Sequence, residues 1–155
     1  MKTIFAILLI STFWISTIST IVYEALKSDS LETVESALTS LNAENANSLN
    51  NAYAGALTMK KAGFIKVPAK KVKIFKQGHQ LLEGEIAAHP NNIEYRFLRL
   101  AVQENAPKIL KYDQNIDEDK AMILANYKGL NPQLKKHIQE YSMNSLILKT
   151  SDLKD

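Results

Sequence analysis

The sequence predicts an all-α protein, a single domain built as a helical array of five to six helices. Apolar residues recur at three- and four-residue steps through almost every segment after the first two dozen residues, and no stretch shows the apolar/polar alternation of a half-buried strand. Glycines and prolines are few, and the prolines, with Gly63 and Gly129, fall at plausible joints between these helical segments. The 155 residues include no cysteine, which excludes disulfides, thiol catalysis and thiolate metal sites.

The N-terminal segment has the layout of a secretory signal. A short basic tip precedes residues 3–23, which carry no charge. Small residues at Thr17 and Ser19 suit a signal peptidase, so we expect residues 1–20 to be a signal peptide. The alternative is an uncleaved anchor over residues 3–23, because about 20 apolar residues approach the length that spans a bilayer. Both alternatives predict an exported protein, periplasmic or associated with the cell envelope, whose only membrane contact is this segment.

Two helices are predicted next. The first covers residues 30–41, and Ser28 or Asp29 is placed to cap it. The second covers residues 43–62, and Gly63 is placed to end it in a left-handed conformation. Small residues within the second helix would let a neighbouring helix approach closely: Ala52, Ala54, Gly55 and Ala56.

The third and fourth helices meet at a Pro-Asn-Asn break. The third covers residues 69–88 and ends before Pro90, because the residue preceding a proline is pushed out of helical conformation. The fourth covers residues 92–105 and is closed by Pro107. The apolar stripe of the third helix consists of Val72, Phe75, His79, Leu82 and Ile86.

A polar line runs along the fourth helix between two apolar flanks. Its members fall at i, i+4, i+7 and i+11: Asn92, Arg96, Arg99 and Gln103. A helix that is polar on one narrow face and apolar on both sides is expected to be wedged between two neighbours, as helices are inside a repeat stack.

The last two helices are predicted from their caps. Asn115 followed by Glu118 predicts a capping box for a helix that closes at Gly129. Asn131 before Pro132 predicts the start of the final helix, because proline suits the first helical position.

These elements predict the domain boundaries. The helical domain is expected over residues 28–146, with one extra turn at residues 108–112. Residues 147–155 are expected to form a polar, frayed C-terminal tail.

The joint at residues 85–92, Glu-Ile-Ala-Ala-His-Pro-Asn-Asn, resembles that of tetratricopeptide-type (TPR-like) repeats, where a second helix ends at proline and Asn-Asn leads into the next helix. The chain is also similar to a group of small, uncharacterised exported bacterial proteins, in residues 53–63, 96–100 and 103–107. The resemblance covers about residues 45–145. It implies TPR-like helix-turn-helix stacking and no activity.

Arg96 and Arg99 are the main candidates for a binding site. Three residues apart on a helix, they project to one face and could grip a carboxylate, phosphate or sulfate, with Gln103 extending the line. The alternative is that both arginines pair with acids of their own fold. The acids considered for that pairing are Glu83, Glu85, Glu94 and Glu104.

No metal site or cofactor is predicted. His79 lies on an apolar stripe and is expected in the core, whereas His137 is expected to face solvent. No two histidines have the i, i+4 spacing of a helical metal pair, and no Glu-x-x-His is present. The acids at residues 117–119 are explained as the first turn of a helix.

The charge distribution is uneven. Residues 60–76 hold seven lysines and no acid, whereas residues 24–44 hold five carboxylates and one lysine. The lysines do not gather on one stripe, which favours a solvated face balanced by the acidic first helix over contact with an anionic surface. The net charge of +3 is too small to indicate a nucleic-acid partner.

We expect a non-enzymatic protein, because the sequence has no Gly-x-Ser-x-Gly motif and no glycine-rich phosphate loop. The predicted role is an interaction module that binds a peptide or protein partner at the cell envelope. The residues expected to bind that partner are Tyr53, Lys60, Arg96, Arg99, Gln103 and Glu104.

The alternative function is a small-ligand carrier or an accessory subunit of an envelope enzyme or transporter. That function needs a closed apolar pocket, whereas an open groove favours the partner-binding role. The pocket expected for a carrier would be lined by Tyr53, Phe75, His79 and Phe97.

Overall fold

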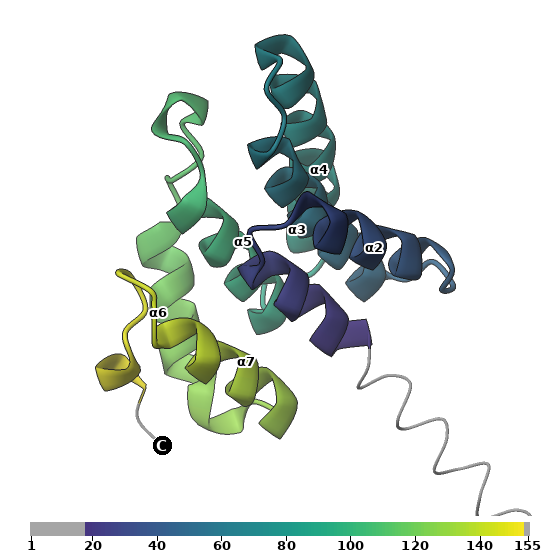
Figure 1. Ribbon diagram of the computed structural model, residues 1–155. Coiled ribbons are helices and arrows are strands. Elements are labelled where there is room, and N and C mark those ends of the chain that lie inside the picture. Colours follow the sequence, from purple (N-terminus) through teal and green to yellow (C-terminus); the bar gives the residue numbers. More distant parts are fainter. Residues whose placement is uncertain (1–17, 154–155) are drawn as a thin grey trace, which may run out of the picture.

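The structure, a computed structural model, describes residues 18–153, and this part of the chain contains helices and no strand (Figure 1). The all-α prediction is confirmed. The α-helices are a helix over residues 18–27, α2 (Leu31–Asn42), α3 (Ser48–Gly63), α4 (Pro68–Ala88), α5 (Ile93–Asn105), α6 (Ile116–Asn126) and α7 (Pro132–Ser142). Three short 3₁₀ turns are η1 (Lys108–Leu110), η2 (Tyr127–Gly129) and η3 (Thr150–Asp152).

Helix α5 lies at the centre of the fold. It contacts α3, α4 and α6, and nine of its 13 residues are buried. The expectation of a helix wedged between neighbours is therefore confirmed. Asn92, which the sequence indicated as the first residue of the helix, is its N-cap, because its side chain accepts hydrogen bonds from the backbone N–H groups of Glu94 and Tyr95.

The helix over residues 18–27 belongs to the core, although the sequence indicated a domain that begins at residue 28. Val22 and Ala25 are fully buried. The ring of Tyr23 stacks on those of Phe97 and His137, with centroids 5.7 and 4.1 Å apart. Figure 1 shows this helix, in purple, lying between α2 and α7.

The expected signal or anchor lies largely outside the described residues, in residues 1–17. Within the described part, no helix combines the length and the apolar character needed to cross a membrane.

Helices α3 and α4 pack together more extensively than any other pair, and Gly55 and Gly78 make this approach possible (Figure 1). A Cβ on Gly55 would lie 2.7 Å from the backbone nitrogen of Leu82, and one on Gly78 would lie 2.5 Å from the carbonyl oxygen of Gly55. The two backbones are therefore in direct contact at this crossing, as the small residues of α3 predicted.

Several predicted helix ends differ from the structure, among them the start of α2 and the end of α3. The N-cap of α2 is Ser30, whose side chain accepts from the Thr33 N–H, because Ser28 is occupied by the N–H of Ser30 itself. Gly63 does not adopt a left-handed conformation, since α3 continues through it to a right-handed Phe64. In the described residues, only Lys111 has a positive φ, of 49°.

The capping box expected at Asn115 does not form. Its side chain makes no bond to the helix backbone and instead accepts a hydrogen bond from Gln103 on α5, so a tertiary contact replaces the local one. The final helix begins as predicted, with Asn131 accepting from the Leu134 N–H and proline at the first position.

The C-terminal segment differs from the expected frayed tail. Within residues 147–153, Leu148 is fully buried and Lys120 forms an ion pair with Asp152 at 2.7 Å. His137 also differs from expectation, being only 6 % exposed because it faces the helix over residues 18–27 and not solvent.

Replacing Gly55 or Gly78 by alanine should destabilise the fold. The new methyl group would meet backbone atoms, which cannot move aside without separating α3 from α4, so we expect a loss of about 1–3 kcal/mol or more in the free energy of unfolding. Chemical denaturation of each variant measures the change.

Gly84→Ala is the matched control on α4. A Cβ at Gly84 has no other atom within 4 Å, and alanine has the higher helix propensity, so stability should rise by roughly 0.5–1 kcal/mol. Equal effects at Gly84 and Gly78 would contradict the close backbone contact.

Candidate functional site

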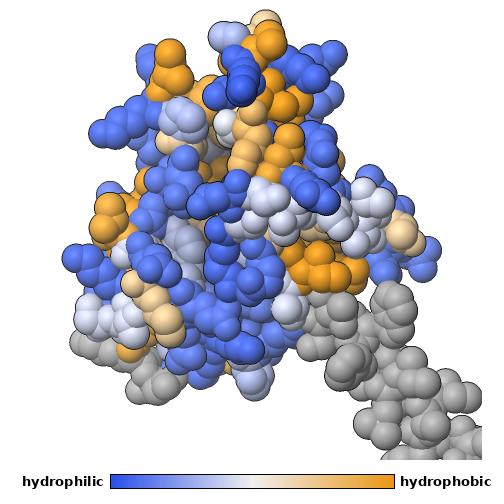
Figure 2. Space-filling model, viewed as in Figure 1, coloured by the Kyte–Doolittle hydropathy of each residue, from blue (hydrophilic) through white to orange (hydrophobic). Residues whose placement is uncertain are grey.

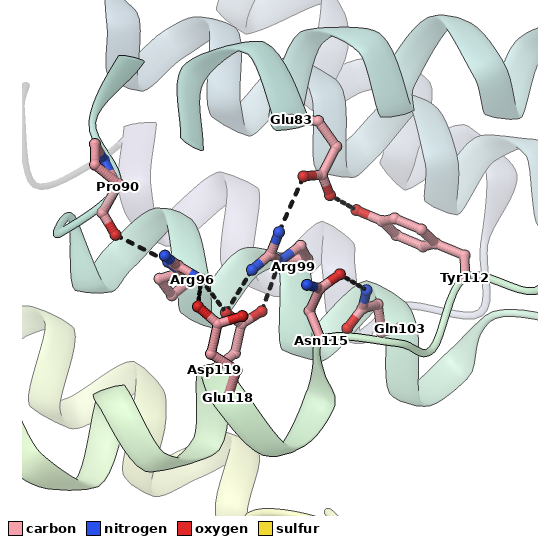
Figure 3. Close-up of polar contacts among 9 residues, drawn as sticks. All are labelled: Glu83, Pro90, Arg96, Arg99, Gln103, Tyr112, Asn115, Glu118 and Asp119. Atoms are coloured by element: carbon pink, nitrogen blue, oxygen red, sulfur yellow. Dashed lines mark hydrogen bonds and ion pairs between the residues drawn. The ribbon is translucent and has the colours of Figure 1, made fainter. Parts of the chain in front are cut away.

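Asp119 joins the two arginines of the polar line (Figure 3). Its carboxylate is fully buried. Arg99 donates from Nε to Oδ2 and from Nη2 to Oδ1, both at 2.7 Å, which is a bidentate pair. Arg96 donates from Nη1 to the same Oδ1 at 3.0 Å. One carboxylate on α6 therefore holds two guanidinium groups of α5.

Both arginines make further hydrogen bonds within the fold. Arg99 Nη1 donates to Oε2 of Glu83 on α4 at 3.0 Å. Arg96 Nη1 donates to Oε1 of Glu118 at 2.9 Å, and its Nε donates to the carbonyl oxygen of Pro90 at 3.0 Å. The arginines are 8 % and 4 % exposed, so neither presents a free guanidinium to a partner.

The electrostatic environment keeps the arginine charges paired. Burial opposes the charged form of Arg99, but the hydrogen bonds and charges of Asp119 and Glu83 outweigh it and raise the arginine pKa. The hydrogen bond and charge of Arg96 lower the pKa of Glu118. Internal pairing, one of the two alternatives drawn from the sequence, is thus what the structure has. Glu83 was among the expected partners, whereas Asp119 and Glu118 were not.

Gln103, the last residue of the polar line, also bonds to a side chain of the neighbouring segment. Gln103 donates from Nε2 to Oδ1 of Asn115 at 3.3 Å, and its Oε1 is buried without a partner among the described residues. The hydroxyl of Tyr112 donates to Glu83 Oε1 at 2.6 Å and extends the network toward the segment before α6 (Figure 3). This arrangement ties α4, α5 and α6 together.

Tyr53 and Glu104 also form hydrogen bonds within the fold. Tyr53 is 2 % exposed and donates its hydroxyl to Glu94 Oε1. Glu104 accepts from the Ser145 hydroxyl and the Leu146 N–H, both at 2.6 Å, and from the Tyr141 hydroxyl. Glu104 therefore anchors the segment that follows α7, and it does not pair with a lysine or an arginine.

Two of the expected site residues, Lys60 and Glu104, line a solvent-accessible hollow. A cleft of about 600 Å³, open to solvent, lies between the helix over residues 18–27, the C-terminal ends of α3 and α5, the start of α4, and α7. We call it the central groove. Its apolar and aromatic lining comes mainly from Tyr23, Met59, Phe64, Phe75, Phe97 and Tyr141.

Three lysines line the central groove, and only one of them, Lys27, forms ion pairs with described residues. Lys27 bonds to Glu140 at 2.8 Å and to Glu24 at 2.9 Å. Lys60 and Lys71 form no ion pair with any described residue, and the Lys60 ammonium lies 5.9 Å from the centre of the Phe64 ring. Asp29 and Glu104 of the same lining likewise form no ion pair with a described residue, so the lining carries both signs and the unpaired charge next to the Phe64 ring is that of Lys60.

Apolar side chains continue beyond the groove onto the surface. Figure 2 shows hydrophobic residues gathered over the free end of the α3–α4 pair, while the face over α6 and α7 is mostly hydrophilic. The exposed apolar residues nearest in sequence to the groove lining include Val67, which is 58 % exposed, and Ile109, which is 88 % exposed.

The six residues expected to bind a partner do not form one surface. Lys60 and Glu104 both line the central groove. Arg96, Arg99 and Gln103 lie in the contact between α5 and α6. Tyr53 is buried on another side of the fold. The polar line of α5 therefore holds helices together and does not form a binding surface.

Comparisons with protein-family models, with curated proteins and with solved structures found no match to this chain. Within the described residues, no group of three or more histidine, aspartate or glutamate side chains is placed to hold a metal ion.

Asp119→Asn should strongly destabilise the protein. The change removes the charge that pairs with two buried guanidinium groups, and breaking a buried ion pair from one side costs about 3–5 kcal/mol. Thermal and chemical unfolding measure the loss.

Asp117→Asn is the control, because this exposed residue lies in the same first turn and loses the same interaction with the helix dipole. Its effect should stay within about 1 kcal/mol. If both variants lose the same stability, the arginines do not depend on Asp119.

Proposed function

We propose that this protein is a non-enzymatic interaction module whose central groove binds an acidic, partly apolar segment of a partner protein at the cell envelope. The observation that carries the proposal is the unpaired Lys60, with Lys71, at the edge of an open, aromatic-lined cleft. Aromatic side chains supply most of the contact energy in such interfaces, and complementary charges select and orient the partner.

The groove suits a chain segment better than an enclosed ligand. It is open to solvent and has a volume of about 600 Å³, and the exposed apolar residues Val67 and Ile109 are close in sequence to lining residues Phe64 and Leu110. A small-ligand carrier would bury most of its ligand in a closed pocket. Of the four residues expected to line such a pocket, Phe75 and Phe97 line the groove, and Tyr53 and His79 do not.

The proposal also includes a TPR-like stacking of the helices and export of the protein to the cell envelope. A TPR-like stack is supported by the joint at Pro90 between α4 and α5, where the polar cap at Asn92 opens the next helix. Export is supported by the uncharged residues 3–23. Cleavage after Ser19 would leave Tyr23 in place, so a mature chain would keep the core contacts of this residue.

Site-specific crosslinking in intact cells tests the groove. A photoreactive amino acid at Asn144, which lines the groove, should give an adduct with a defined partner protein, identified by mass spectrometry. The same amino acid at Asn126, an exposed asparagine at the end of α6, should not. An adduct shared by both positions would reflect proximity alone and would contradict the proposal.

Charge reversal then tests the recognition. Lys60→Glu with Lys71→Glu should reduce the Asn144 adduct at least about tenfold, because the variant repels an acidic partner. Lys73→Glu with Lys76→Glu changes the same net charge on exposed lysines outside the groove lining and should leave the adduct unchanged. A small molecule retained by the purified chain in native mass spectrometry, with no adduct in cells, would favour the carrier function instead.

A further inference from the structure

Glu94 is a half-buried carboxylate without a counter-ion. It lies in the first turn of α5, and both Tyr53 and Tyr23 donate hydroxyl hydrogen bonds to the same oxygen, Oε1, at 2.5 and 3.1 Å. Its other oxygen, Oε2, accepts no hydrogen bond from a described residue. No lysine, arginine or histidine of the described chain forms an ion pair with it.

This carboxylate lines a second hollow, separate from the central groove. The hollow has a volume of about 440 Å³ and lies between the start of the helix over residues 18–27, the α2–α3 connection and the start of α7. We call it the Glu94 pocket. Besides Glu94 and Tyr53, its wall includes Glu44, Leu49, Asn50 and Asn131.

The chemistry of the wall is that of a cation receptor. The described residues that line the Glu94 pocket include two carboxylates and no lysine or arginine. Asn50 uses its amide nitrogen to donate to the Asn45 carbonyl oxygen, which leaves its own side-chain oxygen as an acceptor. Glu94 Oε2, the Glu44 carboxylate and the Asn50 side-chain oxygen are therefore acceptors of this wall, and none of the described residues that form it carries a positive charge.

Packing alone does not explain a charged residue at this position. The dipole of α5 favours a negative charge in its first turn, but that effect is available at the surface of the helix too. Burial raises the pKa of Glu94, although the hydrogen bonds from Tyr53 and Tyr23 oppose the shift. A glutamine would accept the same two hydroxyl bonds without the cost of a buried charge.

We propose that the Glu94 pocket binds a small organic cation, whose ammonium or guanidinium group donates to Oε2 of Glu94. The hollow is far larger than a single metal ion needs, and its volume is in the range of small-molecule sites. The face of Leu49 offers contact to an alkyl chain, and Glu44 at the exposed side offers a second acceptor for a cation with two charged ends. This site does not depend on the partner proposed for the central groove.

Calorimetric titration of the purified full chain tests the proposal with three probes. Cadaverine carries two ammonium groups, agmatine carries an ammonium and a guanidinium group, and pentanediol is the uncharged analogue of cadaverine. We expect saturable binding of cadaverine or agmatine and none of pentanediol. Equal binding of the diol, or no binding of either amine up to millimolar concentrations, would overturn the proposal.

Two variants test whether the amine binds at the Glu94 carboxylate. Glu94→Gln keeps an acceptor for both tyrosines and should weaken amine binding about tenfold or more, because a charge-assisted hydrogen bond is lost. Glu32→Gln removes an exposed carboxylate from the first turn of α2 and should leave binding unchanged. Unaltered affinity in a folded Glu94→Gln variant would overturn the assignment.

A third variant tests the hollow even if Glu94→Gln fails to fold. Leu49→Trp fills the pocket from its partly exposed wall and should abolish amine binding while thermal unfolding shows the fold intact. Binding that persists in a folded Leu49→Trp variant places the amine elsewhere and rejects the pocket. Because Leu49 does not line the central groove, partner crosslinking at Asn144 should persist in this variant, which separates failure of this inference from failure of the proposed function.

Discussion

The ion pair between Asp119 and the two arginines of α5 is the constraint on which the rest of the structure depends. A fully buried carboxylate can face two guanidinium groups only if α6 lies in one position against α5, and Glu83 extends the same requirement to α4. Apolar contacts tolerate small shifts, whereas a bidentate pair does not. The central groove and the Glu94 pocket both border α5, so their shapes follow from where this network holds the helix.

The contact between α3 and α4 complements this polar constraint with a steric one. Gly55 and Gly78 allow the two backbones to touch, which removes any side-chain layer between the helices at that point. The same contact borders the central groove, because the backbone of Met59 lies against Gly78 and Met59 also lines the groove.

The sequence predicted features that depend on neighbouring residues and missed those that depend on distant ones. The break at Pro90 and the cap at Asn131 are local, and they form as expected. The role of Asp119 was not predictable, because acids in a first turn look alike until the rotation of α6 against α5 is known. The burial of His137 was missed for the same reason, since the helix that covers it comes from the far end of the chain and begins within the uncharged segment that indicated a signal or anchor.

The helix over residues 18–27 brings the N-terminal part of the described chain into contact with α7. The hydroxyl of Ser19 lies 3.3 Å from Nε2 of His137, across a separation of 118 residues, and Tyr23 stacks on the same histidine ring. The core is thus completed by joining the first described helix to the last one. Contacts of this separation are slow to form, because a long stretch of chain must be ordered before they stabilise it. During synthesis the docking surface of the N-terminal helix, to which α3 and α5 also contribute, is therefore incomplete until α7 has emerged, so one side of this helix stays uncovered until most of the chain has been made.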